Sequence, residues 1–311
     1  MSEYAIQTEN LVKYFDGRCV LDGIDLKVPQ GCIYGLLGRN GAGKTTIIRI
    51  LLGLEPATRG KSAMLGEASW QLPVSVLGQI GYVAEGHNLI PNYTVWRIVQ
   101  LYKQLSAKWD EQFFHKLIET FRLPLERKVS QLSRGMKAQL NLSLAMATEP
   151  KLLILDDPTL GLDTVSRRQF LELAIDLISK DGRTILFCSH ILSDVERIAD
   201  RVGILRAGKL IVDCSLEELK KRVRKLRVIF DGEPPKQLPI TEIISEKRQG
   251  REITVTVANW NENKQAILNI FKPASCTDIP MTLEEIFIEC TASADEAAVD
   301  YEKGEPICSH S

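Results

Sequence analysis

The residues best suited to chemistry in this chain form a glycine-rich segment with the pattern G-x-x-x-x-G-K-[ST]. Glycines let the backbone curl so that successive N–H groups point at one anion, and a helix N-terminus adds its positive dipole end. In such a loop the lysine reaches the β- and γ-phosphates of a nucleotide, and the next hydroxyl can hold Mg²⁺. The sequence therefore predicts a phosphate-binding loop made of Gly38, Arg39, Asn40, Gly41, Ala42, Gly43, Lys44, Thr45 and Thr46.

The sequence on either side of this loop supplies the elements that would position it. An apolar run at 32–37 leads into the loop, and a helical run at 46–52 leads out and stops at Gly53. This strand–loop–helix context is what the motif needs in order to bind phosphate. It disfavours the alternative, a glycine-rich turn without a ligand.

A pair of carboxylates ends another apolar run. The run from Leu152 to Leu155 is followed directly by Asp156 and Asp157. Such a run is typical of a strand buried on both faces of a parallel sheet, and ligands bind at the carboxyl ends of those strands. We therefore expect Asp156 to hold Mg²⁺, directly or through water, and Asp157 to act on an attacking water. A strand that simply ends in a polar turn is the alternative.

Two further segments do not identify a site by themselves. Ser133 is predicted to be the N-cap of an amphipathic helix, and His190 follows an apolar run that begins at Thr184. Capped helices and histidines at strand ends are mostly structural. The order of the segments along the chain changes this interpretation.

The order phosphate loop, capped helix, Asp-Asp-Pro strand and strand-histidine resembles the layout of ABC-type ATPases. The resemblance covers residues 6 to about 219. It implies an α/β P-loop NTPase fold with a mixed or parallel core sheet, an antiparallel β-subdomain and a helical subdomain. It also implies that the protein binds ATP and Mg²⁺.

The resemblance assigns a role to the start of the capped helix. Leu132, Ser133, Arg134, Gly135 and Met136 correspond to the signature segment of the family. In that family the signature of one chain binds the γ-phosphate of ATP held by the phosphate loop of another. The resemblance therefore implies a second ATPase chain as a partner.

Other residues take their roles from the same resemblance. His190 corresponds to the switch histidine, and Asp163 lies in the D-loop. Glu85 falls at the Q-loop, as a further catalytic residue and Mg²⁺ ligand. Phe15 falls where the family places an aromatic ring that stacks on adenine, with Tyr14 as the close alternative.

The sequence departs from the family pattern at several of these positions. Glu85 and the altered signature, with Arg134 and Met136, look like variants common among export-type, multidrug and antibiotic-resistance ATPases. Asp157 stands where Glu is expected. Intrinsic pKa values of Asp and Glu differ by only about 0.4 unit, whereas reach falls by about one C–C bond. Because a misplacement near 1 Å can cost on the order of a hundredfold in rate, we expect competent ATP binding with slow or asymmetric hydrolysis.

Length and composition exclude several classes of protein. The 311 residues suffice for one large and one smaller domain, and a net charge of −1 provides no field to recruit nucleic acid. The seven cysteines form no C-x-x-C pair, so reduced thiols are expected rather than a zinc site. The sequence has neither an apolar run long enough to span a membrane nor a signal peptide at its start. We expect a cytoplasmic protein.

The character of the sequence changes along the chain. Residues 1–222 are predicted to form the ATP-binding domain, with an antiparallel subdomain at 4–28 and a helical subdomain at 88–147. Residues 223–291 are predicted to form a small α+β accessory domain, and 292–311 a disordered tail. Capping boxes are predicted to start helices after Ser215 and Thr282.

Two segments are candidates for surface contacts. The basic run Lys220–Arg227 could touch anionic headgroups, although a solvated linker helix is the favoured interpretation. The aromatic run Asn92–Trp96 lies where the family docks on its permease, with core packing of Trp96 as an equal alternative.

Together these features predict the ATP-binding and ATP-hydrolysing subunit of an ABC exporter. ATP-driven closure of a homo- or heterodimer would be coupled to export through separate integral-membrane permease subunits. The protein would then be peripheral on the inner face of the cell membrane. The alternatives are a nucleotide-gated module with little or no hydrolysis, and a soluble ABC protein outside transport.

Overall fold

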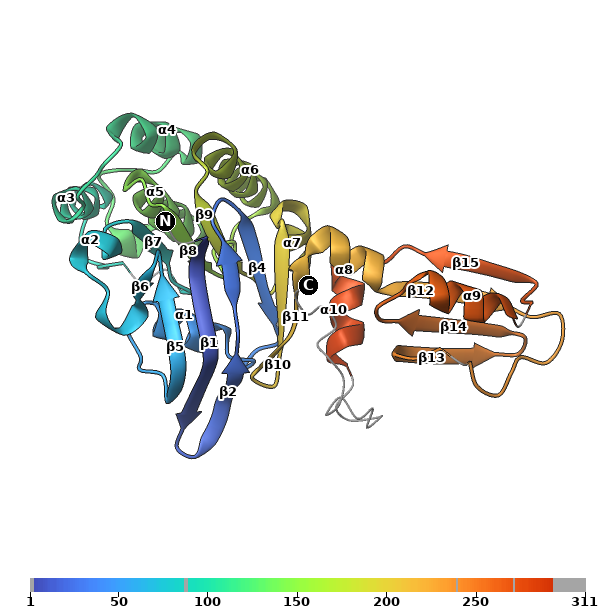
Figure 1. Ribbon diagram of the computed structural model, residues 1–311. Helices are drawn as coiled ribbons and strands as arrows, with labels where there is room; N and C mark the ends of the chain where they lie inside the picture. The colour runs from blue at the N-terminus through green and yellow to red at the C-terminus, as the bar shows by residue number, and fades with distance from the viewer. Residues whose placement is uncertain (1–2, 87–88, 239, 271, 293–311) are drawn as a thin grey trace. The chain divides into compact units, whose positions relative to one another are not determined.

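The computed structural model describes residues 3–86, 89–238, 240–270 and 272–292 (Figure 1). The chain divides into two compact units, Met1–Leu210 and Ile211–Ser311. Each unit has its own sheet and its own hydrophobic cluster, so each is described by itself.

A largely parallel sheet forms the centre of the first unit. Its strand order is β11 (Lys209–Ser215), β10 (Arg201–Arg206), β4 (Ile33–Gly38), β9 (Thr184–Cys188), β8 (Leu152–Asp156) and β7 (Ile80–Val83). From β10 to β7, each strand pairs in parallel with the next one in this order. Every residue of β4, β8 and β9 is buried, as expected of strands covered on both faces. The phosphate loop follows β4, and the carboxylate pair lies at the end of β8.

A second, antiparallel sheet combines strands that precede the phosphate loop with two strands that follow the next helix. Its strand order is β2 (Arg18–Ile24), β1 (Tyr4–Phe15), β5 (Arg59–Met64) and β6 (Glu67–Ala68), with β3 (Lys27–Pro29) also paired to β1. The hairpin between β1 and β2 turns at Asp16 and Gly17, which have φ values of 47° and 80°. The predicted antiparallel subdomain is confirmed.

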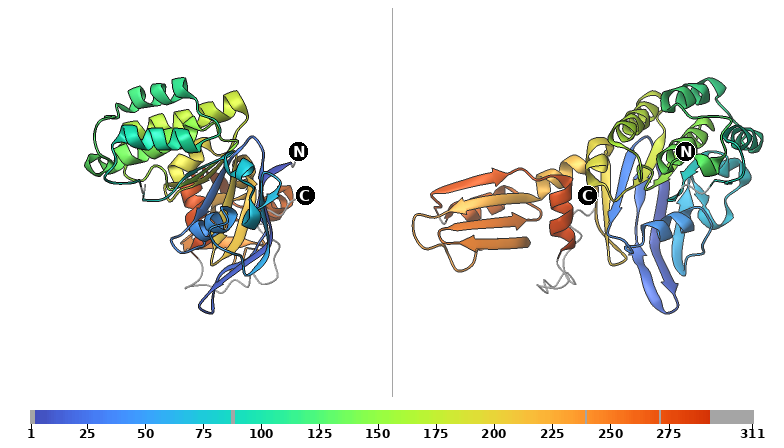
Figure 2. Two further views of the ribbon diagram at one scale, coloured as in Figure 1. Left: turned by 90° about the vertical axis from the view of Figure 1, so that its left-hand side faces the viewer. Right: turned by 180° about the vertical axis from the view of Figure 1, so that it is seen from behind.

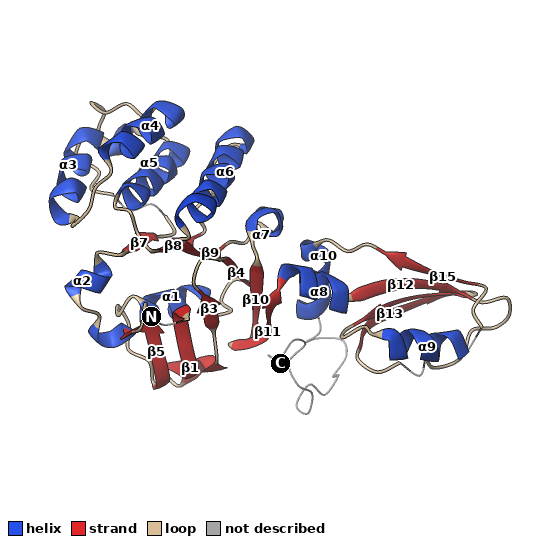
Figure 3. Cartoon of the chain, turned by 45° about the horizontal axis from the view of Figure 1, so that its top comes forward, coloured by secondary structure: helices blue, strands red, loops and turns tan. Residues whose placement is uncertain are grey.

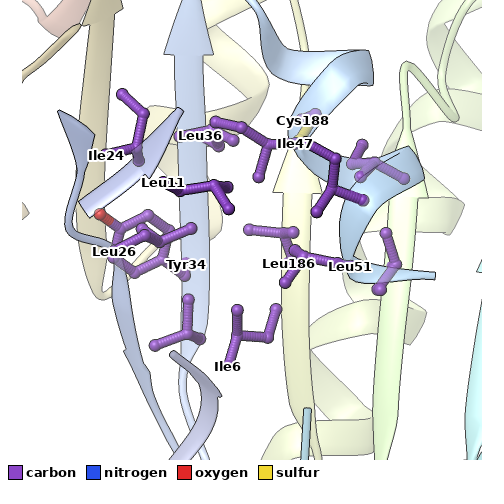
Figure 4. Close-up of a cluster of buried hydrophobic side chains, with 14 of the residues drawn as sticks. Ile6, Leu11, Ile24, Leu26, Tyr34, Leu36, Ile47, Leu51, Leu186 and Cys188 are labelled. Atoms are coloured by element: carbon purple, nitrogen blue, oxygen red, sulfur yellow. The ribbon is translucent and has the colours of Figure 1, made fainter. Parts of the chain in front are cut away.

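Helix α1 (Lys44–Leu51) lies between these two sheets, where Figure 4 shows its side chains. Ile47 and Leu51 of α1 belong to one buried cluster with Leu186 of the parallel sheet and with Ile6 and Leu11 of β1. Each of these side chains is fully buried, which contributes roughly 1.5–3 kcal/mol per residue. This packing fixes the start of α1, and with it the phosphate loop.

The remaining helices of the first unit, apart from the short one before β7, lie on the opposite side of the parallel sheet from α1, and some of them contact β7, β9 and β4 (Figures 2 and 3). They are α2 (Val74–Leu77), α3 (Val95–Leu105), α4 (Glu111–Phe121), α5 (Arg134–Ala147), α6 (Thr164–Asp181) and α7 (Leu192–Ile198), with 3₁₀ turns at Ser69–Gln71 and Val129–Gln131. Side chains cap four of them, since Thr94, Asp110, Ser133 and Asp163 accept from the backbone N–H three residues on. The predicted helical subdomain is thus present, with Ser133 as the N-cap of α5.

The second unit is a four-stranded antiparallel sheet with helices. Its strand order is β13 (Ile243–Gln249), β14 (Glu252–Val257), β12 (Arg224–Ile229) and β15 (Ser275–Ile279), and its helices are α8 (Leu216–Arg222), α9 (Glu262–Ile270) and α10 (Leu283–Thr291). Leu268 of α9 packs with Val228 and Val255 in a separate buried cluster. Ser215 caps α8, and Thr282 forms a full capping box with Glu285. This unit is the predicted α+β region.

The boundary between the units differs from the predicted division at 222/223. It falls after Leu210, within β11, so α8 belongs to the second unit. One reason is nonlocal, because the N–H of Trp260 donates to the carbonyl of Arg222 at 2.8 Å and ties α8 to that unit. The predicted disordered tail lies outside the described residues, apart from Ala292.

The basic run Lys220–Arg227 is neutralised by nearby acids. The ion pairs are Lys221–Glu217, Arg222–Glu218, Arg224–Asp278, Lys225–Glu289 and Arg227–Glu252. Pairing within the unit supports a solvated segment over a headgroup contact. The predicted linker helix is wrong for 224–227, which belong to β12. Within the described ranges, none of the helices combines the length and apolar character that crossing a bilayer requires.

Gly35 in the middle of β4 faces α7 at a point where a methyl group has no room. A Cβ at this position would lie 2.3 Å from Cγ1 of Val195. We expect Gly35→Ala to lower the free energy of unfolding by about 1–3 kcal/mol through overpacking, as measured by urea denaturation. Combining it with Val195→Ala should recover much of the loss, because the two side chains are in contact. Strictly additive losses would contradict the steric cause.

Candidate nucleotide-binding site

The phosphate loop presents backbone donors at the start of α1. Gly43 is the N-cap residue of this helix and supplies no side-chain acceptor, so the N–H groups of the first turn stay available to an anion. Gly41 and Gly43 both have positive φ, at 80° and 110°. The Nζ of Lys44 donates to the carbonyl of Gly38 at 2.6 Å, and this bond joins the end of the loop to its beginning. The geometry is that of an anion cradle.

Asp156 and Thr45 meet beneath this loop. The Oγ1 of Thr45 donates to Oδ2 of Asp156 at 3.2 Å, and the aspartate is only 1% exposed. Burial raises the pKa of Asp156 to about 6; the charges of Asp157 and Glu85 act in the same direction, and the Thr45 hydrogen bond opposes them. A hydroxyl beside a buried carboxylate is an oxygen donor set suited to a hard divalent cation.

A metal here would need further ligands from elsewhere. Within the residues that the structure describes, no group of three or more His, Cys, Asp or Glu side chains could hold an ion. Mg²⁺ commonly takes only one or two protein oxygens and completes its shell with phosphate and water. Thr45 and Asp156 fit that pattern, and Glu85, exposed just beyond β7, faces the same pocket.

Asp157 and His190 are joined at the ends of adjacent strands. Oδ1 of Asp157 accepts from the backbone N–H of His190 at 2.9 Å and lies 2.6 Å from the ring Nδ1. The carboxylate therefore favours the tautomer with a proton on Nδ1 and leaves Nε2 free for another partner. Asp157 has a φ of 47°, a left-handed conformation that is uncommon for a residue other than glycine. The pair is a carboxylate–imidazole unit at the carboxyl edge of the sheet.

A pocket of about 670 Å³ collects most of the predicted residues on one surface. Its walls are Phe15, Arg18, Cys19, Val20, Asn40, Gly41, Gly43, Lys44, Thr45, Thr46, Glu85, Asp157, Ala207 and Gly208. Its wall combines an exposed aromatic ring with the anion cradle, the two kinds of group that contact the base and the phosphates of a nucleotide. Tyr14, the alternative to Phe15, does not line it.

Some predicted residues lie around the pocket and not on its wall. Gly38, Arg39 and Ala42 shape the loop, Asp156 lies behind Thr45, and His190 reaches the pocket through its bond to Asp157. The signature residues Ser133, Arg134, Gly135 and Met136 do not line it. The structure thus brings the phosphate loop, Glu85 and the carboxylates together and leaves the signature outside.

The signature segment packs instead against the chain that follows the carboxylates. A Cβ on Gly135 would lie 3.1 Å from the carbonyl of Gly161, and a Cβ on Gly161 would lie 2.9 Å from Cδ of Arg134. Gln139 donates to Ser166 Oγ at 3.1 Å, and Asp163 accepts two backbone N–H groups at the start of α6. The predicted signature and D-loop residues are neighbours within one chain.

A second hydrogen bond links the segments that follow β8 and β9. Oγ1 of Thr159 donates to Oδ2 of Asp194 at 3.0 Å, and both residues are almost fully buried. Burial raises the pKa of Asp194, whereas the hydrogen bond from Thr159 lowers it. The guanidinium Nε of Arg167 lies 3.8 Å from the same oxygen. Together with Asp157–His190, this contact ties the two strand ends to each other.

Sequence reasoning missed five of the residues that line the pocket. Arg18 could have been found from the hairpin, because Phe15 pairs with Arg18 across the turn. Cys19 and Val20 continue the same strand. Ala207 and Gly208 form the turn between β10 and β11, whose proximity to the pocket is tertiary and has no local signal.

The aromatic run Asn92–Trp96 extends into the first turn of α3, where Val95 is buried and Trp96 faces solvent. Trp96 is 45% exposed, so the alternative of core packing does not apply to it. The guanidinium of Arg97 lies 4.1 Å from the centre of the Tyr93 ring. Docking on a permease through this run stays a prediction.

The sequence is similar to those of known ATP-binding proteins of ABC transporters. A family model described as ABC transporter matches residues 21–160. The chain is 33% identical over 283 residues to the ABC transporter ATP-binding protein YtrB of Bacillus subtilis (strain 168), a match that covers 91% of this chain and 97% of that protein. It is 38% identical over 225 residues to the bacitracin transport ATP-binding protein BcrA of Enterococcus faecalis, with coverages of 72% and 73%. It is 32% identical over 300 residues to the Nod factor export ATP-binding protein I of Neorhizobium galegae, with coverages of 92% and 85%.

Solved structures are similar to about 70% of the chain. An ATP-binding subunit of an ABC transporter superposes with a TM-score of 0.64 at 27% identity, covering 70% of this chain and 92% of that one. An ATP-binding cassette, solved as a dimer in a post-hydrolysis state with ADP and Pi, superposes with a TM-score of 0.61 at 23% identity, covering 68% and 98%. The second likeness concerns the fold alone.

The raised pKa of Asp156 predicts how stability changes with pH. A carboxyl whose pKa is 3.8 when unfolded and about 6 when folded destabilises the folded state once it ionises. We therefore expect Asp156→Asn, in nucleotide-free protein with EDTA, to raise the free energy of unfolding above pH 7 by roughly 1–3 kcal/mol. The gain should shrink as the pH falls through the folded-state pKa of about 6, and it should vanish below the unfolded-state pKa of 3.8. Urea denaturation at several pH values measures this, and a gain independent of pH would contradict it.

Proposed function

The chain belongs to the ABC transporter family as an ATP-binding subunit with ATPase activity, and from that premise we propose how its residues carry out the cycle. The observation that carries the proposal is the single pocket lined by the phosphate loop, Phe15, Glu85 and Asp157. We propose that adenine stacks on Phe15 while the loop from Gly38 to Thr46 wraps the phosphates. The resemblance stated from the sequence is confirmed, and the comparisons give no support to a function outside transport.

The proposed roles at the phosphates follow from charge and position. Lys44 would neutralise the β- and γ-phosphates as it exchanges the Gly38 carbonyl for phosphate oxygen. Mg²⁺ would be held by Thr45 and Asp156, with Glu85 at the edge of its shell, and would neutralise phosphate charge when bound. Burial raises the pKa of Asp156, so its ionised form is unfavourable without a nearby cation, and a bound Mg²⁺ would stabilise it.

Hydrolysis is assigned to the carboxylate–imidazole pair. Asp157 would accept the proton of the attacking water, or orient that water, from the wall of the pocket. His190, with its Nδ1 directed at Asp157, would use Nε2 toward the γ-phosphate. Because Asp157 is shorter than the Glu expected here, we propose slow turnover.

The start of α5 is the proposed contact with a second ATPase chain. Ser133, Arg134, Gly135 and Met136 head α5 outside the chain's own pocket, which fits contact with ATP on a second ATPase chain. Homo- and heterodimers both satisfy this geometry. Relatives carry names such as bacitracin transport and Nod factor export ATP-binding proteins. We propose export through separate permease subunits, with this chain cytoplasmic and peripheral on the inner face of the membrane, and no nucleic-acid partner.

Lys44→Ala should abolish ATP binding. The lysine is held inside the loop by its hydrogen bond to the Gly38 carbonyl, whereas Arg18, another cation on the pocket wall, comes from β2. Isothermal calorimetry with MgATP measures the loss. Lys61→Ala, a change at an exposed lysine of β5 away from this pocket, is the matched control and should bind ATP normally. An affinity of Lys44→Ala within threefold of wild type would refute the assignment of the loop.

Asp157→Asn should preserve ATP binding and lower turnover by roughly two to four orders of magnitude, since it removes a positioned base but leaves Lys44 and Asp156 in place. Phosphate release and calorimetry on the same sample separate the two effects. With ATP trapped in this way, light scattering should detect a dimer, alone or after adding the natural partner chain. Turnover equal to wild type would remove Asp157 as the base and pass the role to Glu85 or His190.

A further inference from the structure

Lys13 of β1 lies against the aromatic ring of Phe15, which lines the pocket. Its Nζ is 4.6 Å from the centre of the Phe15 ring, within the range of a cation–π contact. The lysine is only 6% exposed, whereas Phe15 is 41% exposed and lines the pocket. The ammonium group therefore lies on the inner side of the ring and leaves the outer side accessible.

The ammonium group is itself fixed by two acceptors. Nζ of Lys13 donates to Oε1 of Glu55 and to the carbonyl of Pro56, both at 2.7 Å. Glu55 follows α1, and its Oε2 lies 3.9 Å from Arg49 of that helix. The ring of Phe15 is thus connected through Lys13 and Glu55 to the helix that starts at the phosphate loop.

Backbone contacts hold the same strand in register. The N–H of Thr58 donates to the carbonyl of Val12 at 2.8 Å, and the Oγ1 of Thr58 accepts from the N–H of Tyr14 at 3.0 Å. These bonds fix the backbone on either side of Lys13 but leave the Phe15 side chain unconstrained. A buried cation against its inner face limits the positions that the ring can take.

We propose that Lys13 is a positioning residue for nucleotide recognition, which acts by holding the Phe15 ring at the angle at which a purine base stacks on its outer face. The inference rests on the proposed function, because it takes Phe15 as the stacking ring. It predicts that Lys13 contributes to affinity for the base and not for the phosphates. A purely structural lysine would affect both or neither.

The test compares a nucleotide with its phosphates alone. Calorimetry gives the affinities of Lys13→Met for ATP and for inorganic tripolyphosphate, both with Mg²⁺. We expect ATP affinity to fall by roughly 2- to 30-fold, the range that a cation–π contact supports, and tripolyphosphate affinity to stay unchanged. Lys27→Met is the matched control, because Lys27 lies 5.8 Å from the Tyr4 ring centre and that pair does not line the pocket.

Removing Lys13 leaves Glu55 without its main partner, so a second variant guards against misfolding. Lys13→Met with Glu55→Gln removes both charges and should show the same selective loss of ATP affinity. Unchanged ATP affinity in a folded variant, or an equal loss for tripolyphosphate, would overturn the inference. Phe15→Ala separates the two proposals. If it weakens ATP binding and Lys13→Met does not, only the role of Lys13 fails; if it has no effect, the stacking assignment fails as well.

Discussion

The geometry of this pocket depends on how closely the phosphate loop packs against β2. At Gly43 the backbone has a φ of 110°, and a Cβ there would lie 2.5 Å from Cδ2 of Leu21 and 3.3 Å from the carbonyl of Val20. Only glycine allows both this conformation and this approach. Since α1 begins at the next residue and is buried between the sheets, the contact fixes the phosphate-binding helix relative to the strands that carry Phe15. The spacing between Phe15 and the phosphate loop is therefore a property of the core.

The features that the sequence predicts well are those encoded in adjacent residues. The phosphate loop, the buried strand before Asp156 and the caps at Ser133 and Thr282 each need only a short pattern, and each is present. The boundary between the units was not predictable in this way. It depends on a bond between Trp260 and Arg222, whose pairing no local pattern encodes. The basic run Lys220–Arg227 is a mixed case. Its partners Glu217 and Glu218 are local to α8, whereas Glu252, Asp278 and Glu289 are brought near only by the fold.

The walls of the pocket show the same limit. One part of the wall follows from the phosphate-loop motif, but the rest comes from four other segments: the β1–β2 hairpin, Glu85 after β7, Asp157 after β8 and the turn between β10 and β11. Val20 is placed beside Gly208 by the hydrogen bond from the N–H of Asp22 to the carbonyl of Gly208, at 2.9 Å. Nothing in the sequence around Gly208 indicates a ligand. A sequence therefore predicts which chemistry is present more readily than which surfaces enclose it.

The position of Asp157 illustrates the same difference at atomic scale. From the sequence, only its side-chain length could be compared with that of Glu, which led to an argument about reach. In the structure its left-handed backbone also directs the carboxylate, and Oδ1 is already engaged by two groups of His190. Because Thr159 and Asp194 join the same two segments, a displacement of the carboxylate is also a displacement of the histidine. If Asp157 and His190 have the roles proposed, the group that handles water and the group that meets the γ-phosphate move as one unit, and the reach of Asp157 cannot be changed without changing the position of His190.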